Sequence, residues 1–326
     1  MEFDLIEILR ARCALVRADV RIGIGDDAAV LTPPTGHELV VATDTLVAGV
    51  HFPNATRAED IGWKSLAVNL SDLAAMGATP AWALLALTLP TADADFVTRF
   101  ADGFAALAAQ HHVALVGGDT TSGPLAINVT VLGFVPPGQA LLRDGARPGD
   151  LVFVTGTLGD AAAGLRCDAE ATSRATGSLS VAHGTREALK LRLDRPTPRV
   201  AAGIVLRGVA SACIDVSDGL LADLGHIARQ SGVGIEIAAA ELPASPALLQ
   251  AFDAQTRLAL QATGGDDYEL AFTLAPAREA ETLRDLAKIG CGATRIGRVV
   301  EGVGARLLDE NGASIIIDRP GWEHFA

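Results

Sequence analysis

The chain has 326 residues, 49% of them apolar, and a formal net charge of −13. This length predicts two domains, and the acidic balance argues against nucleic acid or an anionic membrane as a partner, because both require a basic surface. No apolar run approaches the roughly 18 residues of a membrane span, so no transmembrane helix is expected. The four cysteines are far apart without a C-x-x-C pair, which argues against a zinc ribbon or a disulfide framework.

The first half of the chain mixes strands and helices. Its opening segment, MEFDLIEILRARC, is acidic and amphipathic, which is typical of a folded helix rather than a cleaved signal and predicts a cytoplasmic protein. The segment HVALVGGDTTSG is predicted to be a strand that ends in a loop. The other predicted elements are a strand at 38–47 that runs into an acidic turn, a helix at 61–76, strands at 80–90 and 125–136, and a helix at 93–111. Without a regular βαβ order, they predict an α+β layer.

A domain boundary is predicted within PPGQALLRDGARPGD, residues 136–150. Here proline, glycine and charged residues replace the apolar pattern. We therefore expect an N-terminal α+β domain over 1–138 and a C-terminal α/β domain over 139–326.

The second half begins with a strand, a glycine turn and the start of a helix in DLVFVTGTLGDAAAGL. The small, polar stretch 167–187 predicts a mobile loop or a ragged helix. A strand at 212–216 leads through a turn into a helix that ends near residue 230, and a second strand follows. Near the end, Asn311 and Gly312 between two apolar runs predict a hairpin.

Acidic residues recur at conspicuous places. The stretch GIGDDAAVL sets Asp26 and Asp27 side by side, and on this stretch alone an Asx-type turn is the simpler interpretation. Comparable acids stand where an apolar run ends or inside an apolar helix, often beside glycine or a hydroxyl residue. They are Asp44, Asp72, Asp119, Asp215, Asp218, Asp266, Asp267 and Glu269. Each alone is more often a cap or turn residue, but their number favours a common role.

Carboxylates gathered at one place require compensating protons or cations. Because sulfur and histidine ligands at metal spacing are lacking, the fitting ion is Mg²⁺, which oxygen ligands bind together with substrate phosphates. None of the three lysines lies in a G-x-x-x-x-G-K-[ST] motif, which excludes the phosphate loop that uses a lysine. Glycines in VGGDTT and TGTLGD, and the guanidinium of Arg143, suit phosphate contact. A plain turn and a surface ion pair are their alternatives.

The ordered motifs GIGDDAAV, ATDTLVAGVHF, DIGWKSLAVNLSDLAAMGATP, VGGDTTSG, LLRDGARPGD, IDVSDGLLADL and GGDDYEL resemble the thiamine-monophosphate kinase family. The resemblance runs from about residue 23 to the final GWEHF. It implies the aminoimidazole ribonucleotide synthetase-like fold, whose N-terminal domains pair into a barrel, and hence a homodimer with a dimer-forming N-terminal sheet.

The resemblance also implies roles for individual residues. Several Mg²⁺ ions are expected on Asp27, Thr43, Asp44, Asp72, Asp119, Asp215 and Asp218. The positions expected to contact ATP are Gly118, Asp119, Arg143 and Ser217. The positions expected to hold thiamine monophosphate are His51, Glu269 and Trp322. The residues themselves also allow simpler roles, since His51 suits a hydrogen-bonded loop and Trp322 suits a cover over the core, although an aromatic face also suits the cationic thiazolium.

The expected reaction is direct transfer of the ATP γ-phosphoryl group to thiamine monophosphate, with no general base. Among related enzymes, a selenophosphate synthetase is expected to carry a reactive cysteine in a glycine-rich N-terminal region, and Cys13 lies outside any such context. A hydrogenase-maturation protein is expected to end in cysteine, whereas this sequence ends in GWEHFA. An aminoimidazole ribonucleotide synthetase-like enzyme remains an alternative on fold. A non-catalytic module that binds nucleotide or metal is an alternative of a different class.

Overall fold

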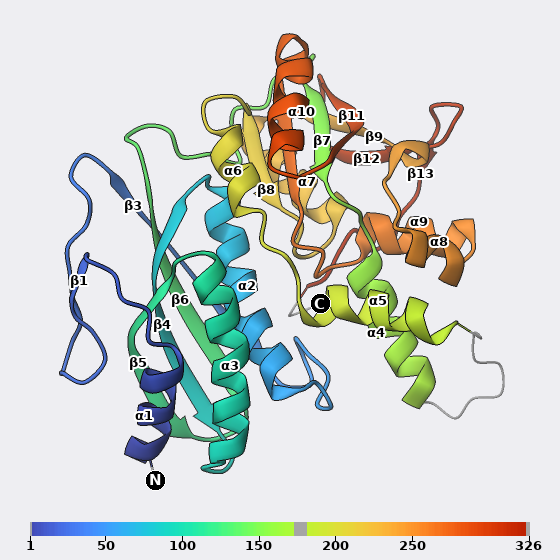
Figure 1. Ribbon diagram of the computed structural model, residues 1–326. Coiled ribbons are helices and arrows are strands. Elements are labelled where there is room, and N and C mark those ends of the chain that lie inside the picture. Colours follow the sequence, from blue (N-terminus) through green and yellow to red (C-terminus); the bar gives the residue numbers. More distant parts are fainter. Residues whose placement is uncertain (1, 173–180, 324–326) are drawn as a thin grey trace. The chain divides into compact units, whose positions relative to one another are not determined.

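A computed structural model describes residues 2–172 and 181–323 (Figure 1). The chain divides into two compact units. Unit 1 comprises Met1–Leu73 and Ala78–Ala140, and unit 2 comprises Ala74–Gly77 and Leu141–Ala326. In the part of the chain that the structure describes, no helix is both long and apolar enough to cross a bilayer.

The elements up to Val135 build unit 1. They are α1 (Glu2–Arg12), β1 (Val20–Ile22), β2 (Val30–Leu31), β3 (Glu38–Val47), α2 (Ala58–Ala75), β4 (Thr79–Leu89), α3 (Ala94–Gln110), β5 (Ala114–Ser122) and β6 (Ala126–Val135). The four longer strands form a sheet in the order β3-β6-β4-β5, in which β4 and β5 run parallel and the other pairs antiparallel. Helices α2 and α3 lie side by side over this sheet (Figure 1).

Alternation along the strands decides which side chains meet the helices. On β3, even-numbered residues are more buried than their odd-numbered neighbours, and Leu46 is fully covered. On α2, the buried residues Leu66, Leu70 and Leu73 recur every three or four positions and so share one face of the helix. The even-numbered side chains of β3 therefore point toward α2, and the odd-numbered ones toward the opposite face of the sheet.

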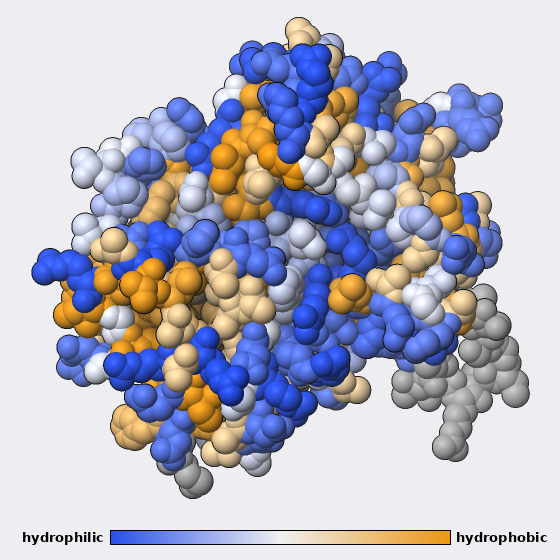
Figure 2. Space-filling model, viewed as in Figure 1, coloured by the Kyte–Doolittle hydropathy of each residue, from blue (hydrophilic) through white to orange (hydrophobic). Residues whose placement is uncertain are grey.

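That opposite face is only partly covered within unit 1. Val20 and Leu31 of the β1–β2 pair pack against a cluster that includes Trp82. Farther along β3, Leu39 and Val41 remain 49% and 55% exposed. Figure 2 shows further apolar surface where unit 1 carries β1, which contains the exposed Ile22. Unit 1 thus exposes apolar side chains both on this sheet face and on the β1–β2 hairpin.

The remaining elements build unit 2. They are β7 (Leu151–Thr155), α4 (Asp160–Thr172), α5 (His183–Asp194), α6 (Val200–Leu206), β8 (Ala212–Asp215), α7 (Leu220–Ser231), β9 (Gly234–Ala238), η1 (Ala239–Glu241), α8 (Pro246–Ala251), α9 (Ala254–Thr263), β10 (Leu270–Leu274), η2 (Pro276–Arg278), α10 (Glu279–Lys288), β11 (Ala293–Val300), β12 (Gly304–Leu308) and β13 (Ser314–Ile315). The described strands form a sheet in the order β13-β12-β9-β11-β7-β10-β8.

This second sheet is mixed. Among its described strands, β9 and β12 pair in parallel and the other pairs are antiparallel. Helix α7 packs on it through Leu220, Leu224 and Ile227, all fully buried in a cluster with residues of β7, β8 and β9. A short turn at residues 216–219 connects the end of β8 to the start of α7.

Most of the elements expected from the sequence are present, including the N-terminal helix, α2, α3 and the hairpin of β12 and β13. Two expectations about turns were wrong. Asp44 lies inside β3, and Gly118 and Asp119 lie inside β5, because cross-strand pairing continues past these polar residues. The expected loop at 167–187 is partly helical, since α4 continues to Thr172 and α5 begins at His183; residues 173–180 of that expectation lie outside the described residues.

Candidate active site

Asp44 and Asp72 lie where β3 meets α2. The Asp44 amide donates a hydrogen bond to Asn69 Oδ1 at 3.0 Å, and the Asn69 side-chain amide donates to the Ser65 carbonyl at 3.0 Å. Asn69 is fully buried, so this amide fixes the strand against the helix. Asp72 follows Asn69 by three residues and therefore lies on the same side of α2. The structure thus places these two predicted ligands at one strand–helix junction.

Thr43 lies on the other face of the same strand. Its hydroxyl donates to the Val129 carbonyl at 3.1 Å and is 2.9 Å from the hydroxyl of its cross-strand partner Thr130. Successive strand residues point to opposite faces, so the Thr43 hydroxyl and the Asp44 carboxylate diverge. The structure does not bring these two predicted ligands together.

Gly118 and Asp119 stand in the middle of β5. Gly118 has a φ of 152°, and a Cβ there would lie 1.8 Å from the Leu85 carbonyl oxygen of β4. This position therefore requires glycine for close strand pairing. Asp119 is exposed and pairs with Ala86.

Asp27 lies in the exposed loop between β1 and β2. Its amide donates to Asp26 Oδ1 at 2.9 Å, a bond to the next residue and not to the residue two positions on that defines an Asx turn. Both aspartates are exposed.

His51 closes the turn that follows β3. Its Nδ1 accepts the Val47 amide at 3.0 Å, and its own amide donates to the Val47 carbonyl at 3.0 Å. Because Nδ1 accepts, a neutral His51 ring carries its proton on Nε2. The buried Lys64 donates from Nζ to the His51 carbonyl at 3.2 Å, which ties the turn to α2.

In unit 2, the turn before α7 is organised by one carboxylate. Asp223 Oδ2 accepts the amides of Ser217, Asp218 and Gly219, each at 3.1 Å. Burial, followed by the charges of Asp215 and Asp218, raises the pKa of Asp223 to about 7, although the amides of Gly219 and Asp218 lower it. Our sequence analysis missed Asp223. Its signal was an acid in the first turn of a helix, where the helix dipole favours negative charge.

Two other segments meet this turn. The Ser217 carbonyl accepts the Asp266 amide at 2.9 Å, and the Asp218 carbonyl accepts the Trp322 amide at 2.9 Å. Trp322 is 56% exposed, so it does not cover the core. Asp266 and Tyr268 have positive φ angles of 69° and 49°, which non-glycine residues rarely adopt outside functional or strained segments.

Arg143 belongs to the same part of unit 2. The neighbouring Leu142 carbonyl accepts the Cys213 amide of β8 at 2.8 Å, which places this segment beside the strand. Burial lowers the pKa of His226 on α7, Arg143 lowers it further, and Asp218 raises it. Both charges therefore act within electrostatic reach of one side chain, and the exposed Arg143 is available to an anion.

Glu269 is fully buried and surrounded by donors. Arg199 donates to Oε2 from Nε and to Oε1 from a terminal nitrogen, both at 2.6 Å. Arg192 donates to Oε1 at 2.8 Å, and the Thr155 hydroxyl donates to Oε2 at 2.7 Å. Our sequence analysis missed both arginines. An acid followed directly by the apolar run LAFTL was the available signal, because a buried carboxylate requires a cationic partner.

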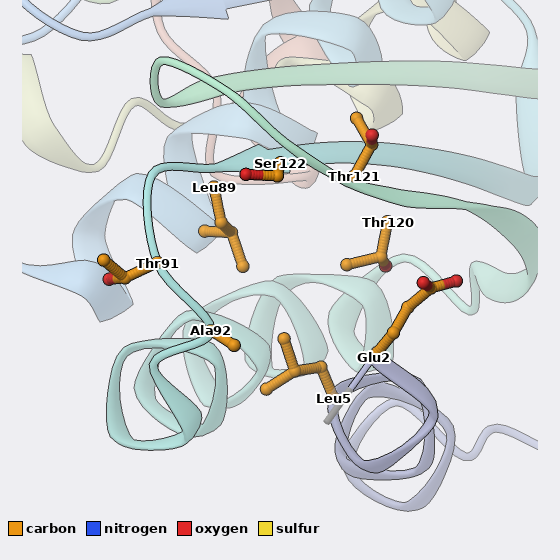
Figure 3. A pocket seen from close by; sticks show the side chains of 8 residues that line it. All are labelled: Glu2, Leu5, Leu89, Thr91, Ala92, Thr120, Thr121 and Ser122. Atoms are coloured by element: carbon orange, nitrogen blue, oxygen red, sulfur yellow. The ribbon is translucent and has the colours of Figure 1, made fainter.

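A hollow of about 400 Å³ opens at the ends of β4 and β5 (Figure 3). Glu2 and Leu5 of α1 face Leu89 and the hydroxyl residues of β5 across it. None of the predicted site residues lines it; its lining residues are Glu2, Leu5, Leu89, Thr91, Ala92, Thr120, Thr121 and Ser122. It provides no link to the predicted chemistry.

Among the described side chains, no three of histidine, cysteine, aspartate or glutamate are grouped as a metal site. Within each unit, the predicted acids instead lie singly or in pairs, inside strands, in turns and where elements meet. The expected convergence of the acids therefore stays a prediction.

Comparisons with known proteins identify the family. The model of the AIR synthase related protein N-terminal domain matches residues 25–135, and that of the C-terminal domain matches residues 147–310. The thiamine-monophosphate kinase of Salmonella typhimurium is 43% identical over all of this chain and 98% of its own length. The chain belongs to the thiamine-monophosphate kinase family. The expected fold class, an α+β domain followed by an α/β domain of the aminoimidazole ribonucleotide synthetase-like type, is thereby confirmed.

Solved structures of thiamine-monophosphate kinases agree with the model. The enzyme from Stenotrophomonas maltophilia is 51% identical, with a TM-score of 0.87 over 96% of this chain and 98% of its own. A structure of AaThiL complexed with AMPPCP and TMP is 34% identical, with a TM-score of 0.77 over 99% of this chain and 97% of its own. The likeness therefore covers both units.

Proposed function

We propose that this protein transfers the γ-phosphoryl group of ATP to thiamine monophosphate and releases thiamine diphosphate and ADP. The observation that carries this proposal is the likeness, over 99% of the chain, to a kinase structure that holds an ATP analogue together with TMP. The new bond joins a phosphate oxygen of thiamine monophosphate to the γ-phosphorus, while the bond from that phosphorus to the β–γ bridging oxygen breaks.

The acceptor needs no catalytic base. A phosphate monoester has a second pKa near about 6, so its oxygen is largely ionised at neutral pH. The obstacle is the repulsion between two anions that must approach. Accordingly, we assign no residue as a proton acceptor. The protein has to position the two substrates and to neutralise the negative charge of their phosphates.

The acids supply the oxygen donors that Mg²⁺ takes. The residues that would hold several Mg²⁺ ions between them are the acids Asp27, Asp44, Asp72, Asp119, Asp215 and Asp218, together with Thr43. Mg²⁺ usually takes one or two protein carboxylates, with water and substrate phosphates completing its shell. Acids that lie singly or in pairs therefore suit Mg²⁺ better than a site in which protein side chains supply every ligand. When bound, the ion neutralises phosphate charge and aligns the attacking and leaving oxygens.

Substrate contacts divide between nucleotide and acceptor. For ATP, we propose Gly118, Asp119, Arg143 and Ser217. For thiamine monophosphate, we propose His51, Glu269 and Trp322. Trp322 exposes a ring that suits the thiazolium cation, a contact worth about 0.5 to 2 kcal/mol. Because both Glu269 oxygens already accept bonds from arginines, its contribution is to hold Arg192 and Arg199 in place.

We also propose a cytoplasmic homodimer. The partly exposed face of the unit 1 sheet supports the dimer, because Leu39 and Val41 present apolar side chains that association would bury. The net charge of −13, which disfavours an anionic membrane surface, supports the cytoplasmic location.

The test is a direct assay of the full chain with ATP, Mg²⁺ and thiamine monophosphate, in which thiamine diphosphate and ADP should form in equal amounts. ATP consumed only with the acceptor of an aminoimidazole ribonucleotide synthetase would instead indicate an enzyme of that kind. ATP binding without turnover of either acceptor would indicate a binding module.

Asp72→Asn should abolish detectable turnover, because it removes the charge of a proposed ligand and keeps its shape. The matched control is Asp95→Asn on α3, whose side chain is 76% exposed and pairs only at the surface with Arg99. Circular dichroism and thermal unfolding should be unchanged in both variants. Normal turnover by Asp72→Asn would remove Asp72 from the metal-binding set.

A further inference from the structure

The Asp223 carboxylate does more than an ordinary helix cap. A capping side chain usually accepts one or two backbone amides; in this protein, Asp253 accepts the Thr256 amide at the start of α9. Asp223 Oδ2 alone accepts three consecutive amides. Its carboxyl group is buried near two further acids, Asp215 and Asp218, an arrangement whose electrostatic cost the amides of Gly219 and Asp218 offset only in part.

The turn that Asp223 holds connects to both proposed substrates. It contains Ser217, proposed for ATP, and Asp218, proposed for Mg²⁺. The Asp218 carbonyl accepts the Trp322 amide, so the proposed acceptor residue is fixed to the same turn. The turn also packs closely against the end of α9, because a Cβ on Gly219 would lie 2.8 Å from the Thr263 carbonyl oxygen and the position therefore requires glycine.

We infer that Asp223 is a positioning residue, which fixes the 217–219 turn so that Ser217, Asp218 and, through the Asp218 carbonyl, Trp322 hold defined places. The roles of those three residues rest on the proposed function. Asp223 itself touches no substrate; it acts through the backbone of the turn.

The first experiment measures amide hydrogen exchange in the wild-type chain and in Asp223→Ala. Exchange should accelerate at least tenfold at residues 217–219. It should also accelerate at the Trp322 amide, which Asp223 does not contact. Faster exchange confined to 217–219 would overturn the inference, because a local cap would not reach Trp322. This arm does not depend on turnover, so it decides the inference even if the wild-type chain fails to phosphorylate thiamine monophosphate.

The second experiment is kinetic. Asp223→Ala should lower kcat/KM for thiamine monophosphate at least tenfold, and Asp223→Asn, which keeps a side-chain oxygen as acceptor, should recover most of that loss. Asp253→Ala is the matched control: it removes a cap from α9, so it should lower thermal stability without changing kcat or KM. If Asp223→Ala does not fold, Asp223→Leu, which keeps much of the side-chain volume but offers no acceptor, takes its place in both experiments. Wild-type kinetics and exchange in every folded Asp223 variant would contradict the inference, whereas an inactive wild-type chain would contradict the proposed function alone.

Discussion

Asp267 is the most completely buried aspartate beside the candidate site. Its Oδ2 accepts the Gly159 amide at 2.7 Å, while its Oδ1 finds no hydrogen-bond partner among the described residues. Burial raises the pKa of Asp267 well above its ordinary value, and the charges of Asp160 and Glu269 add to the rise. The Gly159 amide and Arg192 oppose it. The folded protein therefore retains a proton here that the unfolded chain releases.

This difference predicts a pH dependence of stability. Between the ordinary aspartate pKa and the raised folded value, the native state binds more protons than the unfolded state, so stability falls as pH rises, by up to about 1.4 kcal/mol per pH unit. Asp267→Asn removes this titration and keeps an acceptor for the Gly159 amide. Urea unfolding at pH 5 and pH 8 should give a smaller loss of stability for the variant than for the wild type. Equal losses in both proteins would show that Asp267 is ionised in the folded state.

At the scale of single residues, the sequence predicted which acids are unusual better than it predicted where in the fold they lie. It identified Asp44 and Asp119 as unusual, yet it placed them at turns, because a polar residue after an apolar run reads as the end of a strand. It missed Asp223, whose importance depends on where three backbone amides point. Backbone amides have no sequence signature, so an acid in the first turn of a helix does not by itself show which amides it binds.

At the scale of elements, two glycines set the packing of α2 against α3. A Cβ on Gly62 would lie 2.0 Å from the Phe100 carbonyl oxygen, and one on Gly103 would lie 1.8 Å from the Glu59 carbonyl oxygen. The two helix backbones therefore touch through glycine on both sides. Since α2 carries Asn69 and Asp72, this contact also determines where the helix meets β3.

Gly103→Ala should destabilise the protein by about 3 kcal/mol, because the rigid backbone of the neighbouring helix cannot yield to the added methyl group. Gly225→Ala on α7 is the matched control. No atom lies within 4 Å of its Cβ position, so alanine should stabilise the protein by about 0.5 to 1 kcal/mol. Chemical denaturation of both variants measures the two effects. A loss below 1 kcal/mol in Gly103→Ala would mean that the helices separate at little cost.

Whether a segment forms a helix or a strand followed from its local sequence pattern, whereas the pairing of the strands did not. The apolar periodicity of α2 and α3 and the Asn311-Gly312 turn are local signals, and the structure has the elements that they predict. The strand order β13-β12-β9-β11-β7-β10-β8 joins segments more than 100 residues apart. Nothing in one segment encodes its distant partner, because pairing depends on burial over the whole sheet.

At the scale of the whole molecule, the exposed face of the unit 1 sheet is the surface that we propose binds a partner. Cross-strand neighbours Thr43, Thr130 and Leu84 share this face, and Leu39 and Val41 extend it along β3. A sheet face exposed to water usually alternates polar residues with the buried ones. Apolar residues on such a face therefore favour burial against a second copy of the chain, as the family resemblance implies.

Val41→Asp should convert the proposed dimer into a monomer, because pairing would bury two charged carboxylates without partners. Light scattering should give a mass near the chain mass of 33.5 kDa for the variant and near twice that value for the wild type. Val303→Asp is the control: it places the same charge on a residue that is 91% exposed in the loop between β11 and β12, and it should leave the dimer intact. A wild-type chain that stays monomeric, or a Val41→Asp variant that stays dimeric, would mean that this sheet face is not the interface, and the apolar side chains of β3 would then need another explanation.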